Sequence, residues 1–204
     1  MISTSPAAAH RDDDLQRALD GAVQKYREDG DGPELLRAID VIAVGRSADD
    51  LVAAVEPYRQ IPEIAGPVYE YVVAAQPDNA RALVSLANAY WLTGRGPDVV
   101  GEVASRAIEC DPSNRGAWHL WSLSEGDPRA RVARWRQVVT RFPEDDLARA
   151  SLADNLASLA GAEHDMEALD DAIAQFETLK ARAEHPEQRA SIEGALKSLR
   201  GWKL

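Results

Sequence analysis

The chain has 204 residues, a net charge of −11 at pH 7 and a pI of about 4.8. This charge excludes the broad basic surface that binders of nucleic acid or anionic membranes present, so we expect neither as a partner. Hydrophobic residues make up 45% of the chain, enough for a sizeable buried core.

The cysteine content and the N-terminal segment indicate the cellular compartment to expect. Cys110 is the one cysteine of the sequence, so no disulfide can staple the fold, and we interpret it as a small packing residue at a helix end. Residues 1–10 lack the apolar core of a signal peptide, and no apolar run approaches the roughly 18–20 residues of a membrane span. These features favour a cytoplasmic protein.

The first 46 residues are predicted to form a tail and two helices. Residues 1–11 are expected to be a disordered tail, and 12–46 to be two N-terminal capping helices. The second of these helices, over 34–44, is apolar nearly all round, so we expect it to be buried from both sides. The residues that make it so are Leu35, Leu36, Ile39, Val41 and Ile42.

Two further helices are predicted before Pro77. Ser47 is a good N-cap for a helix that begins at Ala48. Pro57 is expected to kink or end that helix, because proline lacks the amide donor that a helix interior needs. The stretch 61–67 holds Pro62 and Pro67 and is ambiguous, whereas the valines that follow it carry a helix up to Pro77.

A short phrase then recurs along the chain. Pro77-Asp78-Asn79, Pro112-Ser113-Asn114 and Pro143-Glu144-Asp145 each end one apolar helical pattern and open the next, at spacings of 35 and 31 residues. Pro186-Glu187-Gln188 is a fourth echo. A period in the thirties is typical of one helix-turn-helix unit per repeat, stacked into a solenoid.

The segments between these phrases are predicted to be helix pairs. They are expected at 80–92 with 97–108, at 115–124 with 128–142, and at 147–160 with 165–183, followed by a last helix from Pro186. No segment shows the alternation of a strand. The sequence therefore predicts an all-α fold.

Residues 80–112 resemble a tetratricopeptide repeat. Leu83, Leu86, Ala87 and Tyr90 match the pattern of the first helix, and the ending Ala107 to Pro112 matches that of the second. The next unit is three residues short, and the unit after Pro143 has Arg149 where a large residue is usual. The resemblance covers roughly 47–183, which we expect to be degenerate repeats, with 184–204 as a C-terminal capping helix.

The resemblance implies a right-handed superhelix of antiparallel helix pairs whose first helices line a concave groove for a peptide or partner protein. The groove-facing positions that it implies are Arg81, Ser85, Asn88, Trp91, His119, Ser151 and Asp154. Some members of the family grip a peptide carboxylate with lysine, asparagine and arginine. No lysine of this chain matches that set, so we do not expect a carboxylate clamp.

The segment 128–142 contains five arginines and no acid. One interpretation is a solvated face whose arginines pair with acidic neighbours, and another is a patch for an anion or an acidic partner. Nucleic-acid binding by this helix alone is a weaker third interpretation. The arginines concerned are Arg129, Arg131, Arg134, Arg136 and Arg141.

Tryptophans also allow two interpretations. Trp118, Trp121 and Trp135 are either a stacking platform or, as their helical spacing favours, part of a packed core. Trp91 directly follows Tyr90, so one of the two must face away from the core. We expect Trp91 to be the exposed residue.

Sequence motifs for catalysis or metal binding are missing. There is no GxSxG, no phosphate-binding glycine loop, no HExxH and no paired CxxC. Glu163-His164-Asp165 is better explained as a helix cap than as a metal cluster. We therefore expect no enzyme activity, no cofactor and no metal.

The function predicted from the sequence is a non-catalytic adaptor or scaffold that binds another protein or a peptide in its groove. Two alternatives stay open. One is an inhibitor or immunity-type protein whose acidic surface suits a basic partner, and the other is a structural protein that associates with itself through Tyr69–Val73 or Trp202. The sequence does not predict the oligomeric state.

Overall fold

The computed structural model describes residues 6–202, and the side chains from residue 14 onward. Within that range the chain forms eleven α-helices and one 3₁₀ helix, with no strand. The elements are α1 (Pro6–Asp29), α2 (Gly32–Ala43), α3 (Ala48–Val55), η1 (Glu56–Tyr58), α4 (Pro62–Ala75), α5 (Ala80–Leu92), α6 (Pro97–Cys110), α7 (Arg115–Leu123), α8 (Pro128–Arg141), α9 (Asp146–Glu163), α10 (Met166–Arg182) and α11 (Pro186–Arg200).

The predicted tail falls partly outside this range. Residues 1–5 are not among the described residues, and 6–11 are the first turns of α1. The chain divides into two compact units, unit 1 up to Leu120 and unit 2 from Trp121, and the division lies within α7. The finer division into capping helices and repeats stays a prediction.

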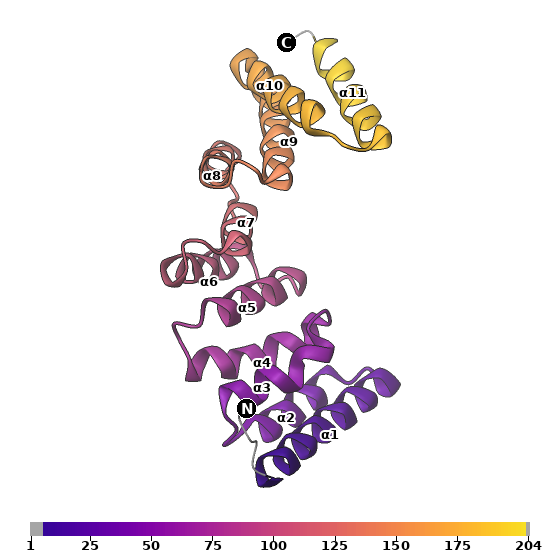
Figure 1. The fold of residues 1–204 in the computed structure, drawn as a ribbon, viewed down its shortest axis with the longest axis vertical. Coiled ribbons are helices and arrows are strands. Elements are labelled where there is room, and N and C mark those ends of the chain that lie inside the picture. Colours follow the sequence, from indigo (N-terminus) through magenta and orange to yellow (C-terminus); the bar gives the residue numbers. More distant parts are fainter. Residues whose placement is uncertain (1–5, 203–204) are drawn as a thin grey trace. The chain divides into compact units, whose positions relative to one another are not determined.

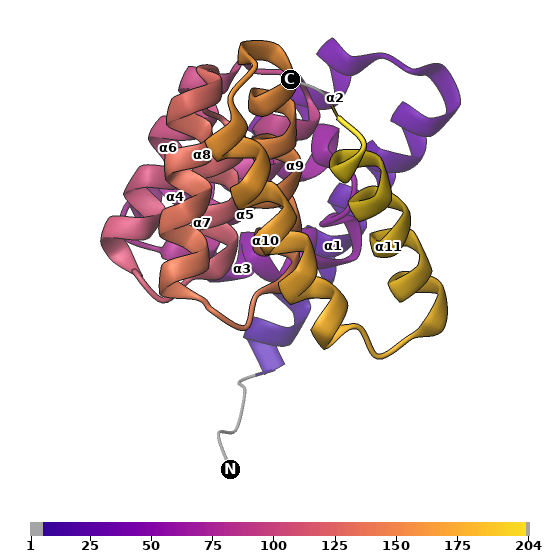
Figure 2. The same cartoon turned by 90° about the horizontal axis from the view of Figure 1, so that it is seen from above.

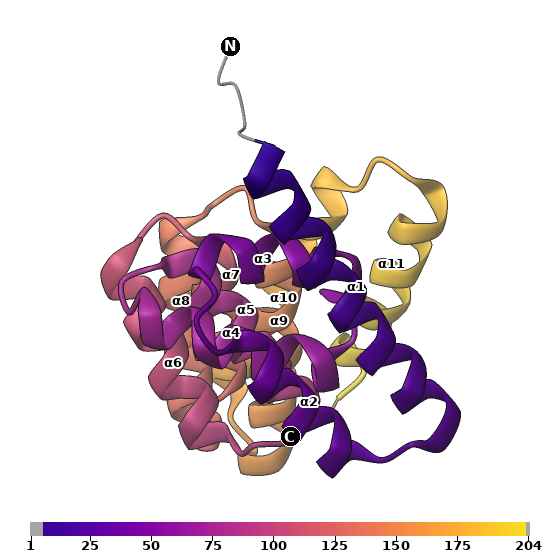
Figure 3. The same cartoon turned by 90° about the horizontal axis from the view of Figure 1, so that it is seen from below.

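Unit 1 is a stack of helix pairs. Helix α1 packs on α2, α3 on α4 and α5 on α6, and each pair also contacts the next through α1 with α3, α2 with α4, and α4 with α5. Figure 1 shows this succession of pairs, and Figure 3 shows α1 and α2 from below. Connections of a few residues make the neighbours antiparallel.

Unit 2 is also built of helices packed on their neighbours in the chain. Helix α9 packs against both α8 and α10, and α10 also packs against α11. In Figure 2, which looks from above, α10 lies in front of α9 and beside α11. Asp165 caps the N-terminus of α10 by accepting from the amide of Ala168 at 3.0 Å, and His164 before it takes a left-handed conformation, so the interpretation of this segment as a helix cap is confirmed.

The recurring phrase is a joint between helix pairs. Its third residue is each time the N-cap of the next helix: the side chains of Asn79, Asn114 and Asp145 accept from the amides three residues later at 3.1, 3.3 and 3.1 Å. The fourth echo differs, because Pro186 is itself the first residue of α11 and the cap position is His185, whose side chain makes no capping bond. Three of the four phrases therefore share one structural role.

Helix α2 corrects one expectation. Leu35 and Ile39 are buried, but Leu36 is 44% exposed and Val41 is 78% exposed. Neighbours cover α2 on one side only, through α1 and α4, so its apolar residues do not all enter a core. The sequence of an apolar helix does not by itself indicate how many neighbouring helices will cover it.

The segment Tyr69–Val73 corrects another expectation. It was one of two surfaces predicted for self-association, yet Tyr69, Val72 and Val73 are buried. Tyr71 is half-buried and its hydroxyl donates to Asp40 of α2 at 2.8 Å. The apolar face of α4 thus packs within unit 1 and is not exposed for self-association.

Helix α4 also resolves the ambiguous stretch 61–67. Pro62 is its first residue, and Pro67 lies inside it. Pro57 ends α3, as predicted, because the next turn is the 3₁₀ helix η1. Gly66 lets α4 approach α5 closely, since a Cβ at that position would lie 3.3 Å from the Cβ of Ala89.

Candidate functional site

Helix α5 has two unlike faces. Leu83, Leu86 and Ala87 are buried, and the hydroxyl of Tyr90 donates to Glu70 of α4 at 2.8 Å. Trp91 points elsewhere and is 41% exposed. The expectation that Trp91, not Tyr90, faces away from the core is confirmed.

The polar positions implied by the family resemblance are spread over three helices. On α5, Arg81 and Asn88 are exposed and Ser85 is half-buried, and the three fall on one side of the helix with Trp91. We name this set, Arg81, Ser85, Asn88 and Trp91, the α5 face. It is the part of the predicted groove that lies on a single element.

The other three predicted positions lie further along the chain. His119 is half-buried on α7, on the same side as Gly116, where a Cβ would lie 3.4 Å from the side chain of Val84 on α5. Ser151 is half-buried and Asp154 exposed on α9 of unit 2. Partial burial raises the pKa of the Asp154 carboxyl. A common groove through all seven positions stays a prediction.

The arginine-rich helix α8 is largely paired on its solvent side. Arg129 forms an ion pair with Glu163 of α9, and Arg136 forms one with Asp171 of α10. The guanidinium of Arg141 lies 5.9 Å from the ring centre of the next residue. Two of the predicted patch residues are therefore neutralised by acids of unit 2.

The two remaining arginines of α8, Arg131 and Arg134, are half-buried and bonded to neighbouring side chains. Arg134 pairs with Glu125 at 2.7 Å, and its guanidinium lies 4.5 Å from the ring centre of Trp121. Arg131 donates to Asn155 at 2.6 Å. These contacts favour the interpretation of a face paired with its neighbours, and its use as an anion patch stays a prediction.

The tryptophans are mostly structural. Trp135 is 1% exposed, whereas Trp118 and Trp121 are half-buried. The indole of Trp118 donates to the carbonyl of Pro112 at 3.0 Å. Core packing is thus observed for Trp135, whereas Trp118 and Trp121 stay partly exposed.

Cys110 differs from its predicted role, because it is exposed at the end of α6 and packs no core. Among the described residues, no three His, Cys, Asp or Glu side chains gather as a metal site. No helix in the range 6–202 is both long enough and apolar enough to cross a membrane.

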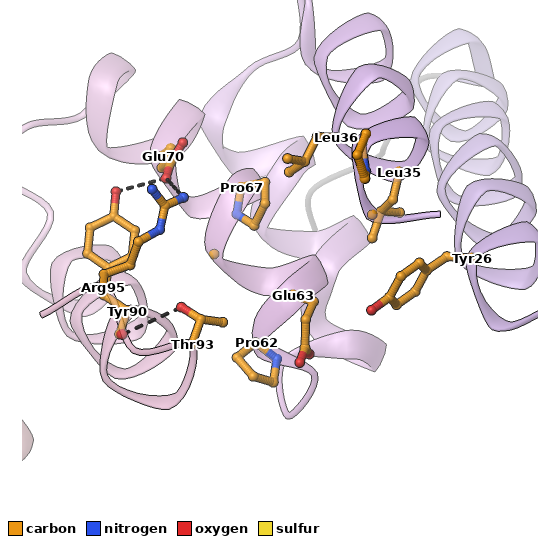
Figure 4. A pocket seen from close by; sticks show the side chains of 13 residues that line it. Tyr26, Leu35, Leu36, Pro62, Glu63, Pro67, Glu70, Tyr90, Thr93 and Arg95 are labelled. Carbon is orange, nitrogen blue, oxygen red and sulfur yellow. Dashed lines mark hydrogen bonds and ion pairs between the residues drawn. The ribbon is translucent and has the colours of Figure 1, made fainter. Parts of the chain in front are cut away.

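A cleft that the sequence did not indicate lies in unit 1, between α2, α4 and the C-terminal end of α5 (Figure 4). Its volume is about 270 Å³. The floor is a stripe of α4, and the lining is mainly apolar. One wall comes from Tyr26 of α1 and the first turns of α2, and the other from the end of α5 and the α5–α6 turn. The residues are Tyr26, Gly32, Pro33, Leu35, Leu36, Pro62, Glu63, Gly66, Pro67, Glu70, Tyr90, Thr93 and Arg95.

The α5 side of the cleft holds a small polar network. Glu70 accepts from the Tyr90 hydroxyl at 2.8 Å, and Arg95 approaches the same carboxylate oxygen at 3.4 Å. The Arg95 guanidinium also lies over the Tyr90 ring, 5.2 Å from its centre. Burial, and then the hydrogen bond to the Glu70 carboxylate, raise the pKa of Tyr90 from 10.0 to about 12.

This network predicts a late tyrosine ionisation. Because folding raises the pKa of Tyr90, its contribution to stability is complete below pH 10 and is lost as the pH rises toward about 12. A titration of tyrosinate absorbance should show this late ionisation in the wild-type chain, and Tyr90→Phe should remove it. Glu70→Gln keeps the burial but removes the charge, so it should shift the late ionisation downward. Identical titrations of wild type and Tyr90→Phe would contradict the assignment.

We compared the chain with known protein families, curated sequences and solved structures. No protein-family model matches the chain, and no curated protein sequence matches it. MamA superposes with a TM-score of 0.57 over 84% of this chain and 96% of its own, at 17% identity. A thermophilic TPR protein of Thermus thermophilus gives 0.55 over 89% of this chain and 98% of its own, at 19% identity. PilF of Pseudomonas aeruginosa gives 0.52 over 95% of each chain, at 15% identity.

At these identities the similarity establishes the fold and nothing finer. The chain has a tetratricopeptide-like fold, an all-α solenoid of antiparallel helix pairs, as the residues from 80 to 112 predicted.

Proposed function

We propose that this chain is a non-catalytic interaction module that holds a partner protein or peptide against the α5 face. The observation that carries the proposal is Trp91, a large aromatic side chain left 41% exposed on the same side of α5 as exposed Arg81 and Asn88. Tryptophan and arginine dominate the energetics of protein interfaces, and asparagine supplies adaptable hydrogen bonds.

The tetratricopeptide-like fold supports the proposal, because stacked helix pairs present long surfaces suited to partner binding. The net charge of −11 supports a protein or peptide partner over nucleic acid or an anionic membrane. A single cysteine, exposed and unpaired by any disulfide, suits a cytoplasmic location.

The same net charge favours a second candidate, an inhibitor or immunity-type protein that acts on a basic partner. Such a complex would depend strongly on salt, because opposite charges steer the two proteins together. Self-association is the weaker alternative, since Tyr69–Val73 is buried and leaves Trp202 as its surface.

A capture experiment tests the proposal. The tagged chain is used to isolate its partner from host lysate, and the affinity of the purified pair is then measured at low and high salt. Arg81→Ala and Asn88→Ala should each weaken the complex by about five- to tenfold. Arg37→Ala, which removes an exposed arginine of α2, is the matched control and should change little.

Salt separates the two candidates. The interaction module predicts that affinity survives high salt and falls with the α5 variants. The inhibitor candidate predicts that affinity collapses at high salt whatever the state of the α5 face. Unchanged affinity in both α5 variants would show that the α5 face is not the binding surface.

A further inference from the structure

The cleft between α2, α4 and α5 lies apart from the α5 face, and its features point to a ligand of its own. Its volume of about 270 Å³ is just below the lower end of typical small-molecule pockets, about 300 Å³. That space suits one large side chain with a short piece of backbone. In Figure 4, Leu36 of α2 lies beside Pro67 of α4, and the Glu63 side chain lies lower in the view, between Pro62 and Tyr26.

The apolar part of the cleft is uncovered and rich in proline. Leu36 is 44% exposed although a leucine of a helical core would ordinarily be buried, and Tyr26 and Pro67 beside it are half-buried. Pro33, Pro62 and Pro67 all line the cleft, and proline side chains lose no rotamer entropy when a ligand orders them. An apolar side chain entering here gains burial against walls that are already in place.

The polar part of the cleft is short of cations. Glu63 is exposed and carries no hydrogen bond or ion pair within the described part of the chain. Pro67 stands four residues after Glu63 and has no amide hydrogen, so the helical bond to the Glu63 carbonyl cannot form. The one cation of the lining, Arg95, is already engaged by Glu70 and the Tyr90 ring.

Acidic groups also border the cleft on the α1–α2 side. A second, smaller hollow of about 40 Å³ shares Tyr26 and Leu35 with the cleft and is lined by Asp29, Asp31 and Glu34. Lys25 balances one of these charges through its ion pair with Glu34. The surroundings as a whole are negative, so they complement a cationic ligand.

We propose that this cleft binds a peptide segment in which a large apolar residue adjoins a lysine or arginine. The apolar side chain occupies the space over Leu36 and Pro67, and the cationic side chain pairs with the Glu63 carboxylate at the rim. The site is independent of the α5 face and would give the chain a second contact for a partner, or a contact for a different one.

Short capped peptides test the proposal directly. The probe is Gly-Ser-Leu-Lys-Ser-Gly, compared with versions in which glutamate replaces the lysine or serine replaces the leucine. Binding to the full chain is followed by amide chemical shifts in NMR spectra. We expect shifts concentrated at residues 26–36, 62–70 and 90–95, and affinities at least about threefold weaker for both altered peptides.

Variants with matched controls sharpen the result. Glu63→Gln should weaken the lysine peptide by about two- to fivefold and should not weaken the glutamate peptide, which loses a repulsion, so the two affinities should converge. Glu187→Gln is its control, because Glu187 also follows a proline at the start of a helix that has no side-chain cap. Leu36→Ser should weaken the lysine peptide by about fivefold or more, whereas Val41→Ser, on the same helix outside the cleft, should not.

Three outcomes would overturn the proposal: shifts scattered outside the cleft, equal affinity for the lysine and glutamate peptides, or equal effects of Glu63→Gln and Glu187→Gln. The experiment uses the chain without its partner. A negative result therefore leaves the α5 proposal untouched, and failure of the α5 variants leaves the cleft untouched.

Discussion

Trp135→Ala is expected to lower the free energy of unfolding by about 3–5 kcal/mol, the largest effect of a single substitution that we predict. Trp135 is 1% exposed and lies on the face of α8 that carries Val132 and Val138, both buried. Removing the indole deletes its apolar contacts and leaves a cavity that close-packed neighbours cannot fill. Urea unfolding followed by the helical circular dichroism signal measures the loss.

Trp202→Ala is the matched control for this prediction. Trp202 is 38% exposed near the end of the described chain, with its ring against Gly161, and its removal should cost about 1 kcal/mol or less. Since the chain forms two compact units, hydrogen exchange should locate the loss of protection caused by Trp135→Ala in residues 121–204. Equal losses in the two variants would contradict the assignment of Trp135 to a core.

Trp91→Ala is expected to weaken partner binding by about 30-fold or more, with little change in stability. The side chain is 41% exposed, so the folded chain loses little packing when it is truncated. A partner that covers the α5 face would bury the indole. Truncation to alanine would remove this buried apolar contact and would let water into the interface. Calorimetry with the captured partner measures the affinity.

Trp202→Ala serves as the control here too, because it removes a tryptophan of similar exposure from another part of the chain. It should leave the affinity for the partner unchanged. Reduced affinity in Trp202→Ala together with unchanged affinity in Trp91→Ala would move the binding surface to the C-terminal end. A drop in the helical signal of Trp91→Ala would show that the residue is structural.

Local chemistry explains what the sequence predicted well. Helix starts were found because caps such as Ser47 and Asp165 act within three or four residues of themselves. The core of α5 was found because Leu83 and Leu86 follow the helical period. The outward position of Trp91 followed from Tyr90 beside it, since consecutive helical residues point in different directions.

What the sequence missed depends on neighbours. The pattern of α2 cannot show that Leu36 and Val41 would lack a covering helix, because coverage is set by residues far away in the chain. The cleft has the same origin: Leu36, Pro67 and Tyr90 meet through the packing of three helices. The one local signal was Pro67 within an otherwise regular helical segment, where a missing amide donor marks an irregular backbone.

The joints at Asn79, Asn114 and Asp145 explain how units of different length coexist in one chain. At the first joint, the amide of Gln76 bonds to Val72, the amide of Asn79 to Gln76, and the amide of Ala82 to the Asn79 side chain, at 2.8, 3.1 and 3.1 Å. The same three bonds recur at the other two joints, so the amides that end one helix and begin the next are bonded within about eleven residues, while the Pro77 and Pro143 carbonyls also accept from Arg106 and Arg182. A gene segment that begins and ends at such joints can be duplicated, shortened or deleted without leaving a helix end exposed. The neighbouring spacings of 35 and 31 residues are what such editing would leave behind.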